Sequence, residues 1–143
     1  MTNQRLGKVT ENLFLEKVAG ADGFATIIPP THLGQPVDVV AVIKSTVFFV
    51  DIKHCSAKRF NFGAIQDNQP LSMEKIWKAS GRGMVEKGKN IKVGFMIFFE
   101  PLQAFRFLSY GMYRSMLAND EKSVKMDDET LEFVDLHHFS YSL

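Results

Sequence analysis

The chain has 143 residues, of which 45% are hydrophobic and 13 are Phe. This is enough for one well-packed domain and too little for two of ordinary size. No apolar run approaches the ~20 residues of a membrane helix, the first five residues lack the apolar core of a signal peptide, and the one cysteine excludes an internal disulfide. We therefore expect a single cytoplasmic domain spanning residues 1–143, without membrane association.

The net charge of +1 conceals an uneven distribution. Residues 44–92 hold ten Lys and Arg against four Asp and Glu, about +6, whereas residues 93–143 hold four against eight, about −4. A basic stretch of this kind suits a phosphate-binding face, although ordinary solvated lysines would give the same count.

The first half of the chain alternates helical and strand-like patterns. Apolar residues recur at helical spacing near the N-terminus until two glycines interrupt them, and short apolar runs follow on either side of a proline-rich loop. The tight connection Lys44-Ser45-Thr46 indicates an antiparallel hairpin. The predicted elements are a helix at about 8–18 and strands at 24–28, 37–43 and 47–53.

The second half begins with a basic loop and a helical pattern that Pro70 bends or restarts and that the Ser80-Gly81-Arg82 turn ends. Beyond the last strand-like runs, an acidic segment at 120–129 is predicted to be solvated. The predicted fold class is α/β, a small mixed β-sheet flanked by helices. The remaining predicted elements are helices at 63–80 and 110–117, strands at 91–99 and 104–108, and an edge strand at 131–136.

The run Val47-Phe48-Phe49-Val50-Asp51-Ile52-Lys53 ends an apolar strand with an acid and a lysine two residues apart. A strand places residues i and i+2 on one face, so Asp51 and Lys53 project together, and Asp38 adds a second carboxylate across the predicted hairpin. Such charges are costly to desolvate unless something compensates them. A divalent cation would do so; the alternative interpretation is a structural ion pair.

Two other segments supply polar residues. Glu11 lies on the first predicted helix, where Glu16 competes with it, and Gln66 and Gln69 lie on the helix after the acid-x-Lys strand. In chain order the pattern is therefore a helix acid, a strand acid, an acid-x-Lys triplet and a downstream glutamine.

This order resembles that of the PD-(D/E)XK nuclease superfamily, and further details resemble the RecU-type Holliday junction resolvases. The resemblance covers about residues 7–117, with an acidic segment at 118–143 after it, and implies a restriction-endonuclease-like core. Its details are Gly7 four residues before Glu11, the F-x-x-x-x-I-x-x-x-Q pattern of Phe60, Ile65 and Gln69, and the strand-like run Gly94-Phe95-Met96-Ile97-Phe98-Phe99.

The resemblance implies phosphodiester hydrolysis with Mg²⁺ or Mn²⁺, which hard carboxylate oxygens bind. Asp38, Asp51 and the Ile52 carbonyl would be direct ligands, and Glu11 would complete the coordination sphere through water or bind a second ion.

The other implied roles concern the substrate. Lys53 would orient the attacking water and stabilise charge on the phosphate, and Gln69 would hydrogen-bond that water or the DNA backbone. The implied catalytic residues are Glu11, Asp38, Asp51, Lys53 and Gln69. The implied DNA contacts are Lys58, Arg59, Gln66, Lys75 and Arg82.

As a resolvase, the protein would cut four-way DNA junctions during recombination and repair. Paired nicks in symmetry-related strands require two sites, so a homodimer is expected, and a bacterial or phage source is implied. The chain departs from the family where Asp51 stands for the usual Glu and Asn68 for the usual His, and the segment between Glu11 and Asp38 is short for the family's stalk. The alternatives are a nickase or duplex endonuclease, and a DNA- or partner-binding protein that has kept the nuclease fold without turnover.

Overall fold

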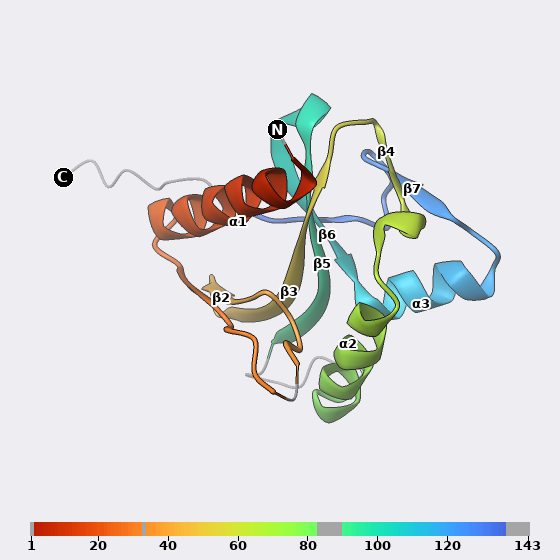
Figure 1. Cartoon of the computed structure of the whole chain (residues 1–143), viewed down its shortest axis with the longest axis horizontal. Coiled ribbons are helices and arrows are strands. Elements are labelled where there is room, and N and C mark those ends of the chain that lie inside the picture. The colour runs from red at the N-terminus through yellow and green to blue at the C-terminus, as the bar shows by residue number, and fades with distance from the viewer. Residues whose placement is uncertain (1, 33, 83–89, 137–143) are drawn as a thin grey trace.

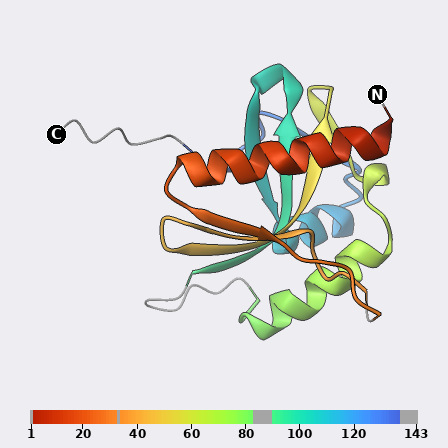
Figure 2. The same cartoon turned by 60° about the vertical axis from the view of Figure 1, so that its left-hand side comes forward.

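The computed structural model describes residues 2–32, 34–82 and 90–136. Helix α1 covers one face of a six-stranded mixed sheet, and α2 and α3 lie on the other face (Figures 1 and 2). The helices are α1 (Asn3–Gly20), α2 (Asn68–Ala79) and α3 (Tyr110–Ala118). The strands are β1 (Phe24–Ile27), β2 (Val39–Ile43), β3 (Thr46–Cys55), β4 (Arg59–Asn61), β5 (Ile91–Phe99), β6 (Ala104–Ser109), β7 (Ser123–Lys125) and β8 (Glu132–Phe133).

The sheet order is β1-β2-β3-β5-β6-β8, with β3 and β5 parallel and the other neighbours antiparallel. The predicted mixed sheet flanked by helices is therefore confirmed. None of the described helices is both long enough and apolar enough to cross a membrane.

Strands β3 and β5 form the centre of the sheet and are covered on both faces. Val50 and Ile52 of β3 pack under α1 with Phe14 and Val18, whereas Phe95 of β5 packs on the opposite face. Covered strands carry nearly continuous apolar runs, which is why the predicted strand at 91–99 matches β5. The Asp51 and Lys53 side chains interrupt this pattern on the α2 side of β3.

The hairpin between β2 and β3 is confirmed. Its register pairs Ile43 with Thr46 and Val39 with Val50, and the two turn residues Lys44 and Ser45 have φ of 48° and 70°. Positive φ at both central residues is the conformation of the two-residue turns that fit the twist of a hairpin. Because β3 is longer than β2, its last residues pair only with β5, so one backbone edge of β3 is left open beyond this hairpin.

The first two predicted helices differ from the observed ones at their starts. Helix α1 begins at Asn3, because the Thr2 hydroxyl caps the Arg5 N–H at 3.2 Å and the polar first turns hide the helical period. Helix α2 begins only at Asn68, after a 3₁₀ turn at Phe62–Ala64. Pro70 lies in its first turn, where no backbone N–H is needed, so of the two predicted outcomes the helix restarts next to Pro70 and is not bent there.

The prediction that residues 120–129 are solvated holds for most of them, which are exposed, but it misses a strand and a buried valine. Strand β7 lies within this segment and pairs with β4 in a separate two-stranded sheet, and Val124 is 1% exposed. A single apolar residue among polar neighbours gives no periodic signal. The last strand, β8, is shorter than predicted, and residues 137–143 of the acidic C-terminal segment lie outside the described residues.

Candidate active site

Two carboxylates each accept a backbone hydrogen bond from the other's segment, where β2 begins and β3 continues past it. The Asp38 backbone N–H donates to Asp51 Oδ1 at 3.1 Å, and the Ile52 backbone N–H donates to Asp38 Oδ2 at 3.0 Å. The predicted juxtaposition of Asp38 and Asp51 across the hairpin is therefore confirmed. The hairpin register fixes it, because Asp38 also donates its N–H to the Val50 carbonyl at 3.1 Å.

Asp51 is a buried acid whose second oxygen has no partner. The residue is 3% exposed, and Asp51 Oδ2 forms no hydrogen bond within the described residues. The pKa of Asp51 is raised to about 7, first by burial and then by the neighbouring Asp38 carboxylate, against the lowering effects of Lys53 and of the Asp38 N–H. A buried carboxylate oxygen without a donor is costly, and a cation is the kind of group that would satisfy it.

Glu11 approaches the same point from α1. It is half-buried, and its pKa is raised first by burial and then by the Asp38 carboxylate, against a lowering effect of Lys8. The competing acid Glu16 is exposed. The structure thus brings Glu11, and not Glu16, into the electrostatic field of the strand acids.

Lys53 and Gln69 form a connected pair beside these acids. The Lys53 ammonium donates to Gln69 Oε1 at 2.8 Å, and the Gln66 backbone N–H donates to the same oxygen at 3.2 Å. Burial lowers the pKa of Lys53, while Asp51 and Asp38 act to raise it. Gln69 therefore holds the lysine, whereas Gln66 contributes its backbone and leaves its side chain exposed.

The donor set fits one hard cation. Asp38 and Asp51 provide carboxylate oxygens, and the Ile52 carbonyl opens towards the same unpaired edge of β3, because the N–H and C=O of one strand residue point the same way. No group of three or more His, Cys, Asp or Glu side chains in the described parts of the chain is arranged as a metal cluster. The fit thus rests on two carboxylates, one carbonyl and the unsatisfied Asp51 oxygen, with Glu11 further out.

A side chain on the other face of β3 ties the layers together. His54 Nδ1 lies 3.0 Å from the Thr10 hydroxyl of α1, and His54 Nε2 lies 2.9 Å from Glu100 Oε2. Thr10 precedes Glu11, so this contact fixes the part of α1 that carries the helix acid. The sequence predicts only that His54 faces away from Lys53; its partners come from segments far apart in the chain and leave no local signal.

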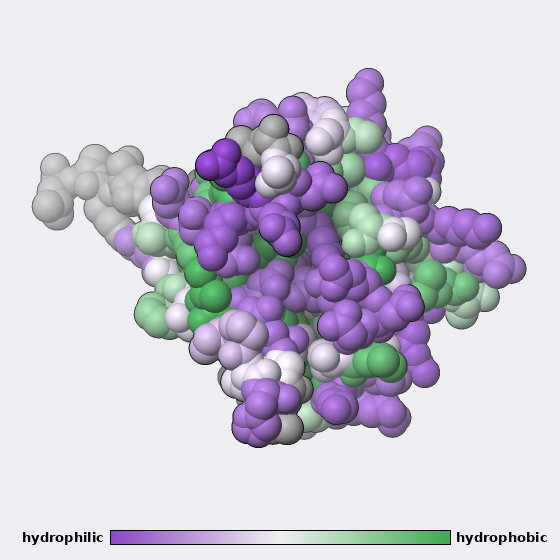
Figure 3. All heavy atoms as spheres, viewed as in Figure 1, coloured by the Kyte–Doolittle hydropathy of each residue, from purple (hydrophilic) through white to green (hydrophobic). Residues whose placement is uncertain are grey.

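The predicted DNA contacts are all exposed but do not all lie together. Lys58 and Arg59 lie where the chain leaves β3 for β4, Gln66 precedes α2, and Lys75 lies on α2. Hydrophilic residues cover much of the face of the molecule on which α1 and β4 both lie (Figures 1 and 3).

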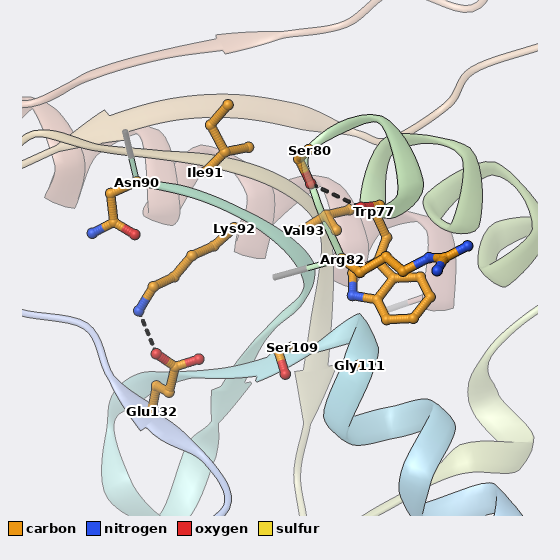
Figure 4. A pocket seen from close by; sticks show the side chains of 10 residues that line it. All are labelled: Trp77, Ser80, Arg82, Asn90, Ile91, Lys92, Val93, Ser109, Gly111 and Glu132. Atoms are coloured by element: carbon orange, nitrogen blue, oxygen red, sulfur yellow. Dashed lines mark hydrogen bonds and ion pairs between the residues drawn. The ribbon is translucent and has the colours of Figure 1, made fainter. Parts of the chain in front are cut away.

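Arg82 belongs to a different region. It lines a pocket of about 360 Å³ with Trp77, near an ion pair between Lys92 and Glu132 (Figure 4). This pocket lies at the start of β5, whereas Asp51 pairs with Phe95 further along that strand. The structure therefore does not bring Arg82 together with the two strand acids.

Comparison with known proteins gives a likeness in structure only. No protein-family model matches the chain, and no curated protein sequence matches it. Among solved structures, one that matches is Hjc of Archaeoglobus fulgidus, described as a Holliday junction resolvase from an archaeal hyperthermophile. It has a TM-score of 0.54 and 18% identity over 87% of this chain and 90% of that chain. The mixed sheet with its flanking helices is thus a fold shared with this resolvase.

Proposed function

We propose that this protein is a metal-dependent endodeoxyribonuclease that cleaves branched DNA and acts as a Holliday junction resolvase in recombination. The observation that carries the proposal is the buried Asp51 carboxylate, interlocked with Asp38, with one unsatisfied oxygen and Lys53 on the same face of the strand. The fold shared with a protein described as a Holliday junction resolvase supports the choice of substrate.

In this mechanism each residue has a distinct task. Asp38, Asp51 and the Ile52 carbonyl would hold Mg²⁺ or Mn²⁺, which would supply Lewis acidity and lower the pKa of a water molecule. Lys53 would orient the attacking water and offer a positive charge to the phosphate. Gln69 keeps the Lys53 ammonium in place through its 2.8 Å hydrogen bond, and Glu11 would complete the coordination of the ion or help to hold a second one.

Resolution of a junction requires two nicks in symmetry-related strands, and one chain supplies one site. We therefore also propose that the active form is a homodimer with two-fold symmetry. Lys58, Arg59, Gln66 and Lys75 are the proposed contacts to the DNA backbone around each site.

The test incubates purified protein with labelled four-way junction or matched linear duplex, in Mg²⁺, Mn²⁺ or EDTA. We expect paired nicks in the junction only, none in EDTA, and rates at least roughly 10²-fold lower for Asp51→Asn and Lys53→Met. Glu11→Gln should also be impaired, and Glu16→Gln, which removes an exposed acid from the same helix, serves as its matched control.

The contrary outcomes are distinct. Absence of cleavage with either metal, together with retained DNA binding, would replace the enzyme by a binding protein on the nuclease fold. Equal cleavage of linear duplex would support the second candidate, a nickase or duplex endonuclease. This candidate is favoured by the short connection from β1 to β2, residues 28–38, which leaves little room for a junction-holding stalk.

A further inference from the structure

Strands β4 and β7 form a two-stranded ribbon apart from the main sheet, here called the β4–β7 ribbon (Arg59–Asn61 and Ser123–Lys125). The central pair, Phe60 and Val124, is 3% and 1% exposed and packs into the core on the α2 and α3 side. Because side chains alternate along a strand, the flanking pairs face outward. The ribbon is thus anchored by one apolar pair and presents a polar face to solvent.

The outward face is basic. Arg59 lies directly opposite Lys125, and both are exposed; the adjoining residues Lys58 and Lys122 are exposed too. Within the described residues, none of these three lysines forms an ion pair, and the Arg59 guanidinium donates to the Ser123 hydroxyl at 2.9 Å. Like charges directly opposite on neighbouring strands are destabilising.

Acids in the same segment offset part of this charge. Asp128 interacts electrostatically with both Arg59 and Lys125, and its pKa is lowered mainly by two hydrogen bonds from Thr130, through the backbone N–H and the hydroxyl. These bonds hold the Asp128 carboxylate within its own turn. Arg59 and Lys125 remain exposed and directly opposed, so an external anion would reduce the repulsion between them.

The ribbon adjoins the candidate active site through the chain itself. Strand β4 follows β3 after a short turn, which the Cys55 thiol holds through contacts of 3.3 Å to the carbonyls of Ala57 and Arg59. After β4, the 3₁₀ turn leads into α2 and to Gln69, the partner of Lys53. Figure 1 shows the ribbon on the side of β3 opposite α1, next to this turn, and Figure 3 shows hydrophilic residues over it.

We propose that the β4–β7 ribbon binds the phosphate backbone of a duplex arm of the DNA substrate, with Lys125 of β7 and the adjoining Lys122 completing the surface that Lys58 and Arg59 begin. The proposal rests on the proposed function for the nature of its ligand. It assigns a binding role to a segment outside the strands and helices that carry the acids. The competing explanation is that lysines here merely discourage pairing with other strands.

The test measures the affinity of the full-length protein for labelled linear duplex and four-way junction by fluorescence anisotropy in EDTA, over a range of salt concentrations. Each lost phosphate contact reduces the slope of log affinity against log salt by about 1, independently of sequence. We expect Lys122→Gln/Lys125→Gln to reduce this slope by about 2. Lys17→Gln, which removes an exposed lysine at the far end of α1 from Glu11, should leave it unchanged.

Two outcomes would overturn the proposal: a slope equal to that of the wild type in the double variant, with unchanged thermal unfolding, or an equal loss in Lys17→Gln. Either result would leave the proposed nuclease activity standing, because binding in EDTA is measured without cleavage. Conversely, a reduced slope in a protein that never cleaves DNA would support the ribbon and contradict the enzyme.

Discussion

At the scale of single residues, the candidate site gathers ionisable side chains whose charged forms are disfavoured by burial. Asp51 and Glu11 have raised pKa values and Lys53 a lowered one, in each case with burial as the largest cause. Perturbed ionisable groups in one place are typical of active sites, although structural ion pairs also produce them. Here the Asp51 oxygen that has no partner within the described residues favours the first interpretation, since a structural ion pair would be expected to occupy it.

The first prediction concerns the pH dependence of stability in metal-free protein. The pKa of Asp51 is near 3.8 in the unfolded chain and about 7 in the fold, so folding favours the protonated carboxyl. The free energy of unfolding is therefore highest, as far as Asp51 determines it, below about pH 4, and it falls as the pH rises towards 7. Asp51→Asn should therefore match the wild type at pH 4 and exceed it by up to a few kcal/mol at pH 8. Urea denaturation in EDTA measures this difference.

The same experiment with added Mg²⁺ provides the control. Cation binding to the charged carboxylate should restore wild-type stability at pH 8 and leave Asp51→Asn unchanged. A difference between the two proteins that does not vary with pH would show that Asp51 carries the same charge throughout this range.

The second prediction concerns Gln69 as the residue that holds Lys53. Gln69→Leu removes the acceptor from the Lys53 ammonium and should lower the cleavage rate by roughly 10²-fold while leaving DNA affinity in EDTA unaltered. Gln4→Leu, which removes an exposed glutamine from the first turn of α1, is the matched control. Equal effects of the two substitutions on the rate would contradict the assignment.

At the scale of elements, close packing of β5 against the end of β6 depends on one glycine. A Cβ at Gly94 would lie 2.2 Å from the Leu108 carbonyl oxygen and 2.9 Å from Ser109 Cα, and neither backbone atom can rotate away. The third prediction is that Gly94→Ala destabilises the fold by about 3 kcal/mol or more in urea denaturation.

A second glycine provides the comparison for this change. Gly7 lies within α1 with nothing within 4 Å of an added Cβ, so Gly7→Ala should stabilise the protein by about 0.5–1 kcal/mol. If both substitutions destabilise the protein equally, the effect is not one of close approach.

The elements also show what local patterns can and cannot predict. The strand β5 and the hairpin turn at Lys44 and Ser45 were predictable because a long apolar run and a short polar break are local signals. The β4–β7 ribbon was not, since its two strands lie about sixty residues apart and Val124 is the only apolar residue in β7. The start of α1 depends on a cap and not on periodicity.

At the scale of the whole molecule, the site is assembled from different layers. The strand acids were predictable as a pair because one hairpin contains both, and the acid-x-Lys spacing places Lys53 beside Asp51. The contacts of His54 with Thr10 and Glu100 were not predictable, because three separate elements meet there. These contacts hold Thr10, and with it the neighbouring helix acid Glu11, against β3.

The fourth prediction is that the active protein is a dimer. We expect sedimentation equilibrium to give twice the 16.2 kDa of one chain at the concentrations where junctions are cut, and mixing with excess Asp51→Asn protein to convert paired nicks into single ones. Paired nicking by a species that remains monomeric with DNA would contradict two-fold symmetry.

The open edge of β3 has a further consequence for this molecule. A strand that extends beyond its neighbour exposes backbone groups with which a strand of another chain can pair. Here, however, the Asp38 carboxylate already accepts the Ile52 N–H on that edge. The acid proposed for catalysis thus also occupies a backbone donor on this open edge. Selection against self-association and selection for chemistry would therefore act on the same carboxylate, so this position has little freedom to change for either purpose alone.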